Sequence, residues 1–472
     1  MARFLHGTVV LWLCTLTEAT TSPRVLHFTD LHVHTTMAAE EQVAINDLHH
    51  QDAHATTTNA LWRSALSAAA QANASFVIWG GDTGPQRCET CFPYEQRHAT
   101  EAIGVASTAL RELLPGVRIF PVIGNTDFAE GAAHVNYADA WAHEASQSAL
   151  QAWLSNGSRR NLLSRGYYSE KVDDVWRVVV LNTRACHIRN FADFKPAPNA
   201  AEQPGLPFFE DQLAWFRQQL ADARLHGSRV IVTGHVPPGI WGGCWGEFSD
   251  EYEDIVASFA DVVALQIFGH QHSGSSRLLR AFADGADRSE QDATASSVAF
   301  ITPSIAPQGG QMPSFRVYTV DPGRAQPVVG FEQYRLDLER PTNADGNVLW
   351  QLSYQAPVHL GLASLSPEEW RRVVQHAATN ATYRSLLMKL ESNGKDWHAG
   401  TKSAKDYACG IKHVGEPAYL RCAGKNQEGA VRDYIMKDHT YVLSAIFPFD
   451  VIMSSFGHSL PGILEEDLLP PE

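Results

Sequence analysis

Short apolar runs alternate with longer stretches of helical spacing along the first two thirds of the chain. Runs of about four to eight β-branched or aromatic residues are typical of buried strands, and apolar residues three or four positions apart are typical of helices. Strands are therefore predicted at 25–28, 76–81, 117–124, 176–182, 229–234 and 264–269, and further on at 298–302, 314–320 and 331–338. Helices are predicted at 61–73, 94–114, 137–154 and 209–225.

This alternation predicts a layered α/β fold, with large mixed β-sheets flanked by helices, over residues 24–345. A stretch rich in Pro, Asn, Asp and Gly at 341–347 marks a boundary. Beyond it, Ser366 followed by Pro367 is typical of a helix start. A small C-terminal helical subdomain is expected over 346–472.

The start of the chain has the layout of a signal peptide. Arg3 precedes an apolar run at 4–16, and small residues follow at 17–19, so residues 1–19 are predicted to be a cleaved signal. No later segment has the length of a membrane-spanning helix, since the best, 441–453, contains Pro448 and Asp450. We therefore expect a protein without a transmembrane segment, secreted or delivered to a lysosome or vacuole.

Composition and charge narrow the classes of function. Hydrophobic residues make up 44% and charged residues 19%, which excludes a disordered or fibrous chain. The 37 basic and 52 acidic residues give a formal net charge of −15. Proteins that bind nucleic acids usually carry a basic surface, so no nucleic-acid binding is expected. The 21 histidines would offset that charge near pH 5. No sequence feature indicates an oligomeric state.

Six cysteines lie outside the expected signal peptide, an even number that favours disulfides in an oxidising compartment. The predicted pairs are Cys88–Cys91, Cys186–Cys244 and Cys409–Cys422. Zinc binding by the first pair is the alternative, but no second CxxC motif completes four sulfur ligands. Glycosylation sequons occur at Asn73, Asn156 and Asn380, which fits a protein of the secretory pathway. So short a pattern also arises by chance.

Candidate chemistry lies where the predicted strands end. Five strand ends each carry Asp, Asn or His, nearly always beside a glycine; these residues are Asp30, His32, Asp82, Asn125, His235, His270 and His272. Polar residues at the carboxyl ends of parallel strands converge on one crevice. Seven oxygen and nitrogen ligands exceed the needs of one tetrahedral ion and suit two divalent metal ions that share a carboxylate.

The motifs around these residues resemble a known family. FTDLHVH, GGDT, GNTD, TGHVPPG and GHQH, in this order and spacing, resemble the calcineurin-like metallophosphoesterase superfamily. Within it, LNTRAC, VTGHVPPG and GIWGGCWGEF resemble the acid sphingomyelinase-like phosphodiesterases, a branch that includes the endopolyphosphatases. The resemblance is strong over 24–340 and weaker in the tail. It favours the members of the branch without a preceding saposin-like module.

The resemblance implies a dinuclear-metal hydrolase of phosphodiester bonds. One metal would be held by Asp30, His32, Asp82 and His272, and the other by Asp82, Asn125, His235 and His270. Mixed His, Asp and Asn ligation suits zinc, iron or manganese, and the resemblance favours zinc. The implied substrates carry a phosphodiester, as in a sphingomyelin headgroup or a nucleotide.

Thr126 departs from the family pattern, which places a histidine after the asparagine as proton donor. A threonine hydroxyl is a very poor acid, and general acids contribute about 10²–10⁴-fold when the leaving group needs a proton. The departure favours a phosphoanhydride substrate such as polyphosphate, because its leaving group hardly needs one. Asp127 is adjacent and could orient a histidine at 126. His98, His187 and His134 are possible substitutes for the missing acid.

The substrate pocket leaves two interpretations open. Trp241 and Trp245 follow a predicted metal ligand and could cradle a quaternary ammonium or stack on a base, or they could pack a loop. Arg184 could bind further phosphates or lie on the surface. A catalytically weak homologue that keeps its metals is the remaining alternative to an enzyme, although the complete ligand set favours the enzyme.

Overall fold

The computed structural model describes residues 22–33, 57–85, 96–127, 148–188, 209–282, 293–307, 311–343, 347–393 and 404–426. All seven predicted metal ligands fall within these ranges. The expected signal peptide, the Cys88–Cys91 pair and His134 lie outside them.

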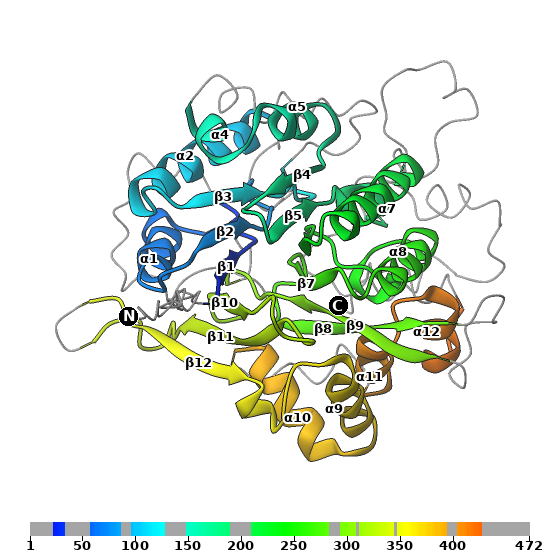
Figure 1. Cartoon of the computed structure of the whole chain (residues 1–472). Helices are drawn as coiled ribbons and strands as arrows, with labels where there is room; N and C mark the ends of the chain where they lie inside the picture. Colours follow the sequence, from blue (N-terminus) through cyan, green and yellow to red (C-terminus); the bar gives the residue numbers. More distant parts are fainter. Residues whose placement is uncertain are drawn as a thin grey trace, which may run out of the picture.

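Two six-stranded sheets form the centre of the molecule (Figure 1). The first has the order β12-β11-β10-β1-β2-β3. Its strands are β1 (Arg24–Phe28), β2 (Phe76–Trp79), β3 (Arg118–Pro121), β10 (Ser314–Val320), β11 (Val328–Leu336) and β12 (Trp350–Ala356). Strands β1, β2 and β3 are parallel and the others antiparallel, so the sheet is mixed as the sequence predicts.

The second sheet has the order β4-β5-β6-β7-β9-β8. It contains β4 (Tyr168–Lys171), β5 (Trp176–Val180), β6 (Arg229–Thr233), β7 (Val263–Phe268), β8 (Ser275–Ala281) and β9 (Thr294–Ile301). Strands β5, β6, β7 and β9 are parallel, whereas β4 and β8 run antiparallel at the two edges. Strands β6 and β7 are almost wholly buried, because their sequences are mostly apolar and β-branched.

Helices flank both sheets. Those of the α/β region are α1 (Asn59–Ala70), α2 (Gln96–Leu113), α4 (Ser148–Trp153), α5 (Asn156–Arg165), α7 (Phe209–Leu225) and α8 (Gly246–Ser258). Short 3₁₀ turns occur at η3 (Thr183–Cys186), η5 (Ile240–Gly242) and η8 (Val358–Leu360). Of the helix predicted at 137–154, only the part in α4 lies within the described residues.

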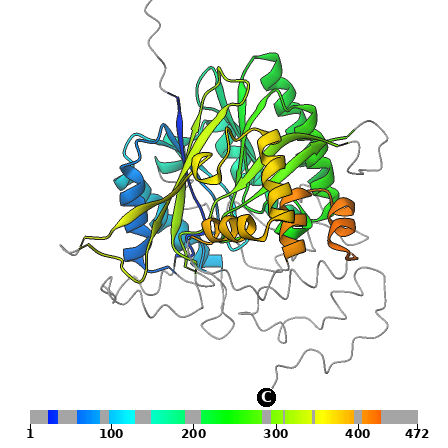
Figure 2. The same cartoon turned by 90° about the horizontal axis from the view of Figure 1, so that it is seen from below.

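The C-terminal helices are α9 (Pro367–Thr379), α10 (Ala381–Glu391), α11 (Ala404–Lys412) and α12 (Glu416–Ala423). Ser366 caps α9 by accepting from the backbone N–H of Glu369, and Pro367 occupies the first turn, as the sequence predicts. These helices pack on β8, β9 and α8, where Figures 1 and 2 show them in yellow and orange. Strand β12 lies beyond residue 345 and still pairs with β11, and the helices follow it.

The buried core joins these parts. One cluster of buried apolar side chains includes Val77 of β2, Val178 of β5 and Trp370 of α9. No helix in the described part of the chain is long and apolar enough to cross a membrane. The three sequon asparagines, Asn73, Asn156 and Asn380, are all exposed.

Candidate metal centre

The predicted ligands meet in two adjacent groups of side chains. Asp30, His32 and His272 form one group and Asp82, His235 and His270 the other, with the ligating atoms of each within 4.8 Å of one another. The first sheet supplies Asp30, His32 and Asp82 from the ends of β1 and β2. The second supplies His235, His270 and His272 from the ends of β6 and β7. The site therefore lies where the two sheets meet.

Five of the candidate ligands have a left-handed backbone conformation, which non-glycine residues rarely adopt. Their φ angles are 54° at Asp30, 46° at His32, 51° at Asp82, 72° at His270 and 58° at His272. Such a conformation costs about 1–3 kcal/mol per residue and persists only where its surroundings enforce it. Its concentration at these five positions points to a functional site.

At two positions beside the candidate ligands there is room only for glycine. A Cβ atom on Gly124 would lie 2.1 Å from Oδ1 of Asp82, and one on Gly269 would lie 2.1 Å from Oγ1 of Thr29. Any side chain at either position would displace an aspartate or its hydrogen-bond partner. This close approach is the reason for the Gly-Asn and Gly-His pairs in the sequence.

Backbone carbonyls orient two of the histidines. Nδ1 of His32 lies 3.1 Å from the carbonyl oxygen of Gly84, and Nδ1 of His235 lies 2.8 Å from that of Gly80. Donation from Nδ1 leaves Nε2 of each ring with its lone pair directed into the site, the arrangement typical of metal-ligating histidines.

Hydrogen bonds also hold the two aspartates, which act as acceptors. Oδ2 of Asp30 accepts from the Thr29 hydroxyl at 2.7 Å and from the backbone N–H of His270 at 3.0 Å. Oδ1 of Asp82 accepts from the backbone N–H of Thr126 at 2.8 Å. The remaining oxygen of each carboxylate faces the histidines: Asp30 Oδ1 lies 3.3 Å from His272 Nε2, and Asp82 Oδ2 lies 3.1 Å from His235 Nε2.

The close packing of these charges shifts their pKa values strongly. Burial would raise the pKa of Asp30 and of Asp82, but neighbouring histidines, His235 foremost, outweigh it and hold both pKa values below the usual range. Burial would lower the pKa of His235, yet Asp82 and Asp30 raise it to about 10. Burial, and then His235, lower the pKa of His270 to about 3. Both carboxylates are therefore ionised, and neighbouring positive charge stabilises them.

Unpartnered atoms test whether metal ions fit the site. Asn125 Oδ1 is buried without a hydrogen-bond partner, and Asp30 Oδ1 and His235 Nε2 lie against other predicted ligands at 3.3 and 3.1 Å. Leaving a buried polar atom unsatisfied costs about 1–3 kcal/mol. Amide and carboxylate oxygens and imidazole nitrogens are all donor types that divalent ions accept. The residues present thus fit a pair of divalent ions.

Thr126 and Asp127 follow the predicted ligand Asn125, and both contact the loop after β2. The Thr126 hydroxyl donates to the carbonyl oxygen of Gly84 at 3.3 Å. The carboxylate of Asp127 accepts four backbone N–H groups, from Asp82, Thr83, Gly84 and Gly124, at 2.8–3.2 Å. Burial, and then the charge of Asp82, raise the pKa of Asp127 to about 6. Asp127 is thus held by four backbone groups.

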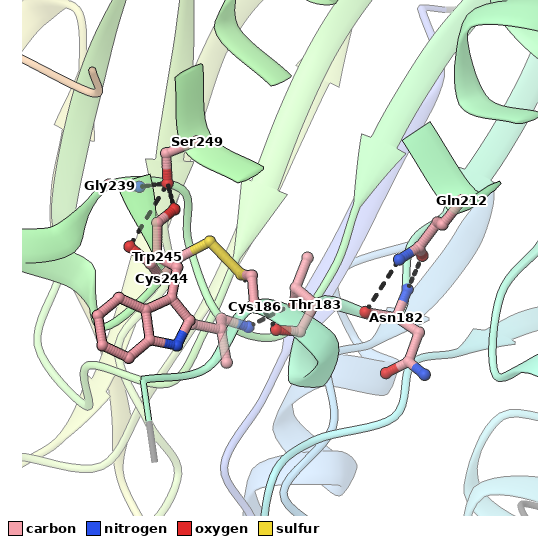
Figure 3. Close-up of a disulfide and its surroundings, with 9 residues drawn as sticks. Asn182, Thr183, Cys186, Gln212, Gly239, Cys244, Trp245 and Ser249 are labelled. Atoms are coloured by element: carbon pink, nitrogen blue, oxygen red, sulfur yellow. Dashed lines mark hydrogen bonds between the residues drawn. A yellow bond between two sulfur atoms is a disulfide. The ribbon is translucent and has the colours of Figure 1, made fainter. Parts of the chain in front are cut away.

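Among the possible substitute acids, His187 lies against the site. Its ring packs edge-on against that of His270, with the centroids 4.9 Å apart. The Cys186–Cys244 disulfide fixes the chain beside it (Figure 3). This bond joins the turn after β5 to the loop after β6, and the Cys409–Cys422 bond joins α11 to α12, so the described residues contain two of the three predicted pairs. His98 is buried in α2.

The predicted pocket residues are largely covered by protein. Trp241 is 4% exposed, Trp245 1% and Arg184 5%. The backbone N–H of Trp245 donates to the carbonyl oxygen of Cys186, and Ser249, which donates to Trp245, holds the same loop (Figure 3). Burial therefore favours the packing interpretation for the two tryptophans.

Comparison with known proteins agrees with this geometry. The family model described as calcineurin-like phosphoesterase matches residues 23–274, more than half of the chain. The chain belongs to the calcineurin-like phosphoesterase family. This membership accounts for the fold and for a centre that binds divalent metal ions.

Three relatives of this calcineurin-like phosphoesterase chain are similar over much of its length. It is 28% identical to Sphingomyelin phosphodiesterase 1 of Caenorhabditis elegans, over 58% of the chain and 47% of that protein. It is 25% identical to Sphingomyelin phosphodiesterase A of Dictyostelium discoideum, over 72% of the chain and 54% of that protein. It is 25% identical to human Acid sphingomyelinase-like phosphodiesterase 3b, over 74% of the chain and 75% of that protein. The chain spans about half the length of the first two.

Sequence reasoning missed several residues that support the centre. Thr29 holds Asp30, and Gln271 and Arg277 contact each other beside the histidine ligands at 3.0 Å. The segment Ser275–Ala281 carries two arginines, Arg277 and Arg280, and offered no apolar run as a signal, because arginine is rarely fully buried without a partner. The pattern predicted no strand there.

Proposed function

We propose that this protein is a dinuclear-metal hydrolase of phosphodiester bonds. Asp30, His32, Asp82 and His272 would hold one ion, and Asp82, Asn125, His235 and His270 the other, with Asp82 between them. The observation that carries the proposal is the pair of adjacent carboxylate–imidazole groups, together with the buried and unpartnered Oδ1 of Asn125. Zinc is the proposed metal, because imidazole and carboxylate ligands together suit it.

The chain itself holds the ligands in place for this chemistry. Bound divalent ions supply charge neutralisation of the phosphate and lower the pKa of a water nucleophile. Gly80 and Gly84 orient His235 and His32 through their carbonyl oxygens, and Thr29 fixes the rotamer of Asp30. These bonds fix the site before substrate arrives, so little reorganisation accompanies the reaction.

The substrate proposed first is a phosphodiester, such as a lipid headgroup or a nucleotide. The names of the relatives, which are sphingomyelin phosphodiesterases, support the lipid. Thr126 supports the second candidate, a phosphoanhydride such as polyphosphate, because a good leaving group needs no proton donor. A homologue that binds metals without turnover is disfavoured, since all seven ligands are present.

The proposed setting is the secretory pathway, with the protein secreted or in a lysosome or vacuole. Two disulfides, one of them buried against the metal centre, support an oxidising compartment. Three exposed sequon asparagines are accessible to glycosylation.

The decisive experiment is an assay on bis-p-nitrophenyl phosphate with metal analysis of the same sample. Its good leaving group needs no acid, so a dinuclear hydrolase should cleave it. Two bound ions per chain without hydrolysis would refute the enzyme. Sphingomyelin, ATP and long-chain polyphosphate, each at pH 5 and pH 7, then separate the two substrate classes.

A further inference from the structure

Gln271 stands between the candidate ligands His270 and His272, and its side-chain amide bonds to two residues outside the candidate ligand set. Its Oε1 accepts from Nη2 of Arg277 at 3.0 Å, and its amide nitrogen donates to the carbonyl oxygen of Trp241 at 3.4 Å. Both flanking histidines have a left-handed backbone. The turn is therefore strained on each side of Gln271, and its side chain is anchored at two points.

Arg277 is a buried cation with a specific set of partners. It is 0% exposed on β8, where its Nη1 donates to the Ser275 hydroxyl at 3.0 Å and to the carbonyl oxygen of Ser276 at 2.8 Å. Its guanidinium lies 4.4 Å from the ring centroid of Trp241. Its Nε is buried without a hydrogen-bond partner, so the bonds of Nη1 and Nη2 and the contact with Trp241 are what hold the guanidinium in place.

The C-terminal helices complete the surroundings of Trp241. Its ring packs edge-on against Tyr407 of α11, 6.1 Å between centroids, and the Tyr407 hydroxyl donates to Glu391 of α10 at 2.5 Å. A Cβ atom on Gly410 would lie 2.2 Å from Cδ2 of Trp241, so helix and ring are in full contact. The backbone N–H of Gly274 donates to the carbonyl oxygen of Glu391 at 2.8 Å.

We propose that Arg277 and the C-terminal helices, acting through Gln271 and Trp241, position the His270–His272 turn for metal binding. Gln271 is then a positioning residue of the metal centre, and the helices are part of its support rather than a separate covering. The inference rests on the proposed function in one respect, that these histidines bind metal. Its physical basis is that a strained turn keeps its geometry only when the surrounding contacts enforce it.

The first test compares Gln271→Leu with Gln271→Glu in the full chain. Leucine keeps the size of the side chain but removes both bonds, whereas glutamate keeps an acceptor for Arg277. The dissociation constant for Zn²⁺ is measured by competition with a chromogenic chelator. Gln271→Leu should weaken it by about 10–100-fold, the usual effect of losing a residue that orients metal ligands, and Gln271→Glu should restore most of it.

Gln355→Leu is the matched control, because Gln355 is also partly buried and hydrogen-bonded, to Glu332, but lies on the edge strand β12. Its Zn²⁺ affinity should equal that of the unaltered protein. Melting of the chelated proteins gives the structural readout. A lower melting temperature of Gln271→Leu with unchanged Zn²⁺ affinity would overturn the proposal.

The second test addresses the helices through Gly410→Ala. Helix propensity alone favours alanine inside α11, but its methyl group must displace Trp241. Weaker Zn²⁺ binding is expected, and unchanged binding would remove the helices from the proposal. Affinity is measured without substrate, so tight Zn²⁺ binding with no hydrolysis by the unaltered protein would refute the proposed function alone.

Discussion

Asp82 faces both ligand groups through one oxygen atom. Its Oδ2 lies 3.1 Å from Nε2 of His235 in one group and 3.9 Å from Nε2 of His32 in the other. Its second oxygen is occupied by the backbone N–H of Thr126. At the residue scale, Asp82 is therefore the side chain whose loss should affect both proposed ions.

Asp82→Asn should remove most of the bound metal and lower hydrolysis of bis-p-nitrophenyl phosphate by at least about 100-fold. The neutral amide of asparagine cannot balance the charge of two cations. Bound ions stabilise the charge of the transition state by several kcal/mol, and each loss of about 1.4 kcal/mol lowers the rate tenfold. Elemental analysis and kinetics check both effects. Asp174→Asn, at a fully exposed aspartate, is the control. Full metal content and turnover in Asp82→Asn would contradict the assignment.

Thr126→His should raise the rate on alkyl phosphodiesters such as sphingomyelin relative to ATP or polyphosphate. The gain should stay below about 100-fold, the low end for a general acid, because Thr126 is only 5% exposed and Asp127 is engaged with the backbone. Thr126→Asn controls for the change in size. Another proton donor must exist if the unaltered protein cleaves sphingomyelin efficiently and Thr126→His leaves the ratio of the rates on the two substrate classes unchanged.

At the scale of elements, the centre consists of the turns that follow strands, and these turns are tied to one another. The carboxylate of Asp127, after β3, accepts the backbone N–H groups of Asp82, Thr83 and Gly84, after β2. It thereby couples the position of Asn125 to that of Asp82. Charged acceptors of several backbone donors are among the stronger hydrogen-bonding groups in proteins.

Asp127→Asn should lower the free energy of unfolding by about 1–3 kcal/mol, since the new amide group would face N–H donors that lose their acceptor. Metal affinity should fall by about 10-fold or more because the two turns lose their link. Urea unfolding of chelated protein and metal titration measure the two effects separately. Asp321→Asn, in a surface turn, provides the comparison. Unaltered metal affinity would exclude the coupling.

His413, between α11 and α12, should make stability depend on pH. Burial, followed by the charges of Arg280, Lys412 and Arg421, lowers its pKa from 6.5 to about 2. The unfolded chain takes up a proton below pH 6.5 and the folded chain does not. The free energy of unfolding should therefore fall by up to about 1.4 kcal/mol per pH unit as pH drops below 6.5.

His413→Asn should flatten this dependence. Urea unfolding of chelated protein between pH 7.5 and pH 5 provides the measurement, because chelation removes the separate effect of pH on metal binding. The exposed His226, changed to Asn, serves as reference. The same slope in the His413 variant as in the reference would show that His413 is not the group responsible.

On the scale of the whole molecule, the metal centre is the junction between the two sheets. Asp30, His32, Asp82 and Asn125 follow strands of the first sheet, and His235, His270 and His272 follow strands of the second. The carboxylates of one sheet lie among imidazoles of the other. Bound ions would therefore stabilise the packing of the sheets as well as provide chemistry.

Chelation should lower the melting temperature, and added Zn²⁺ should restore it. Ions that bind only the folded state contribute about 2.7 kcal/mol per site at a hundred times the dissociation constant. Calorimetry with and without chelator measures the shift. Asp82→Asn should melt at nearly the same temperature in both conditions. A melting temperature that chelation leaves unchanged in the unaltered protein would rule out a structural contribution from the ions.

The sequence alone predicted the strands whose ends meet at the centre, the α9 cap and two of the disulfide pairs, and it supplied the seven proposed ligands. The strands and the cap are local features: an apolar run ending in a glycine and a polar residue specifies a buried strand and what its end presents. Tertiary structure alone decided that the strands form two sheets, that Asp127 binds backbone groups of another turn, and that Trp241 and Trp245 are buried. It also decided that the charged segment Ser275–Ala281 is the buried strand β8. Each of these depends on contacts between residues far apart in the chain, where packing partners override local pattern.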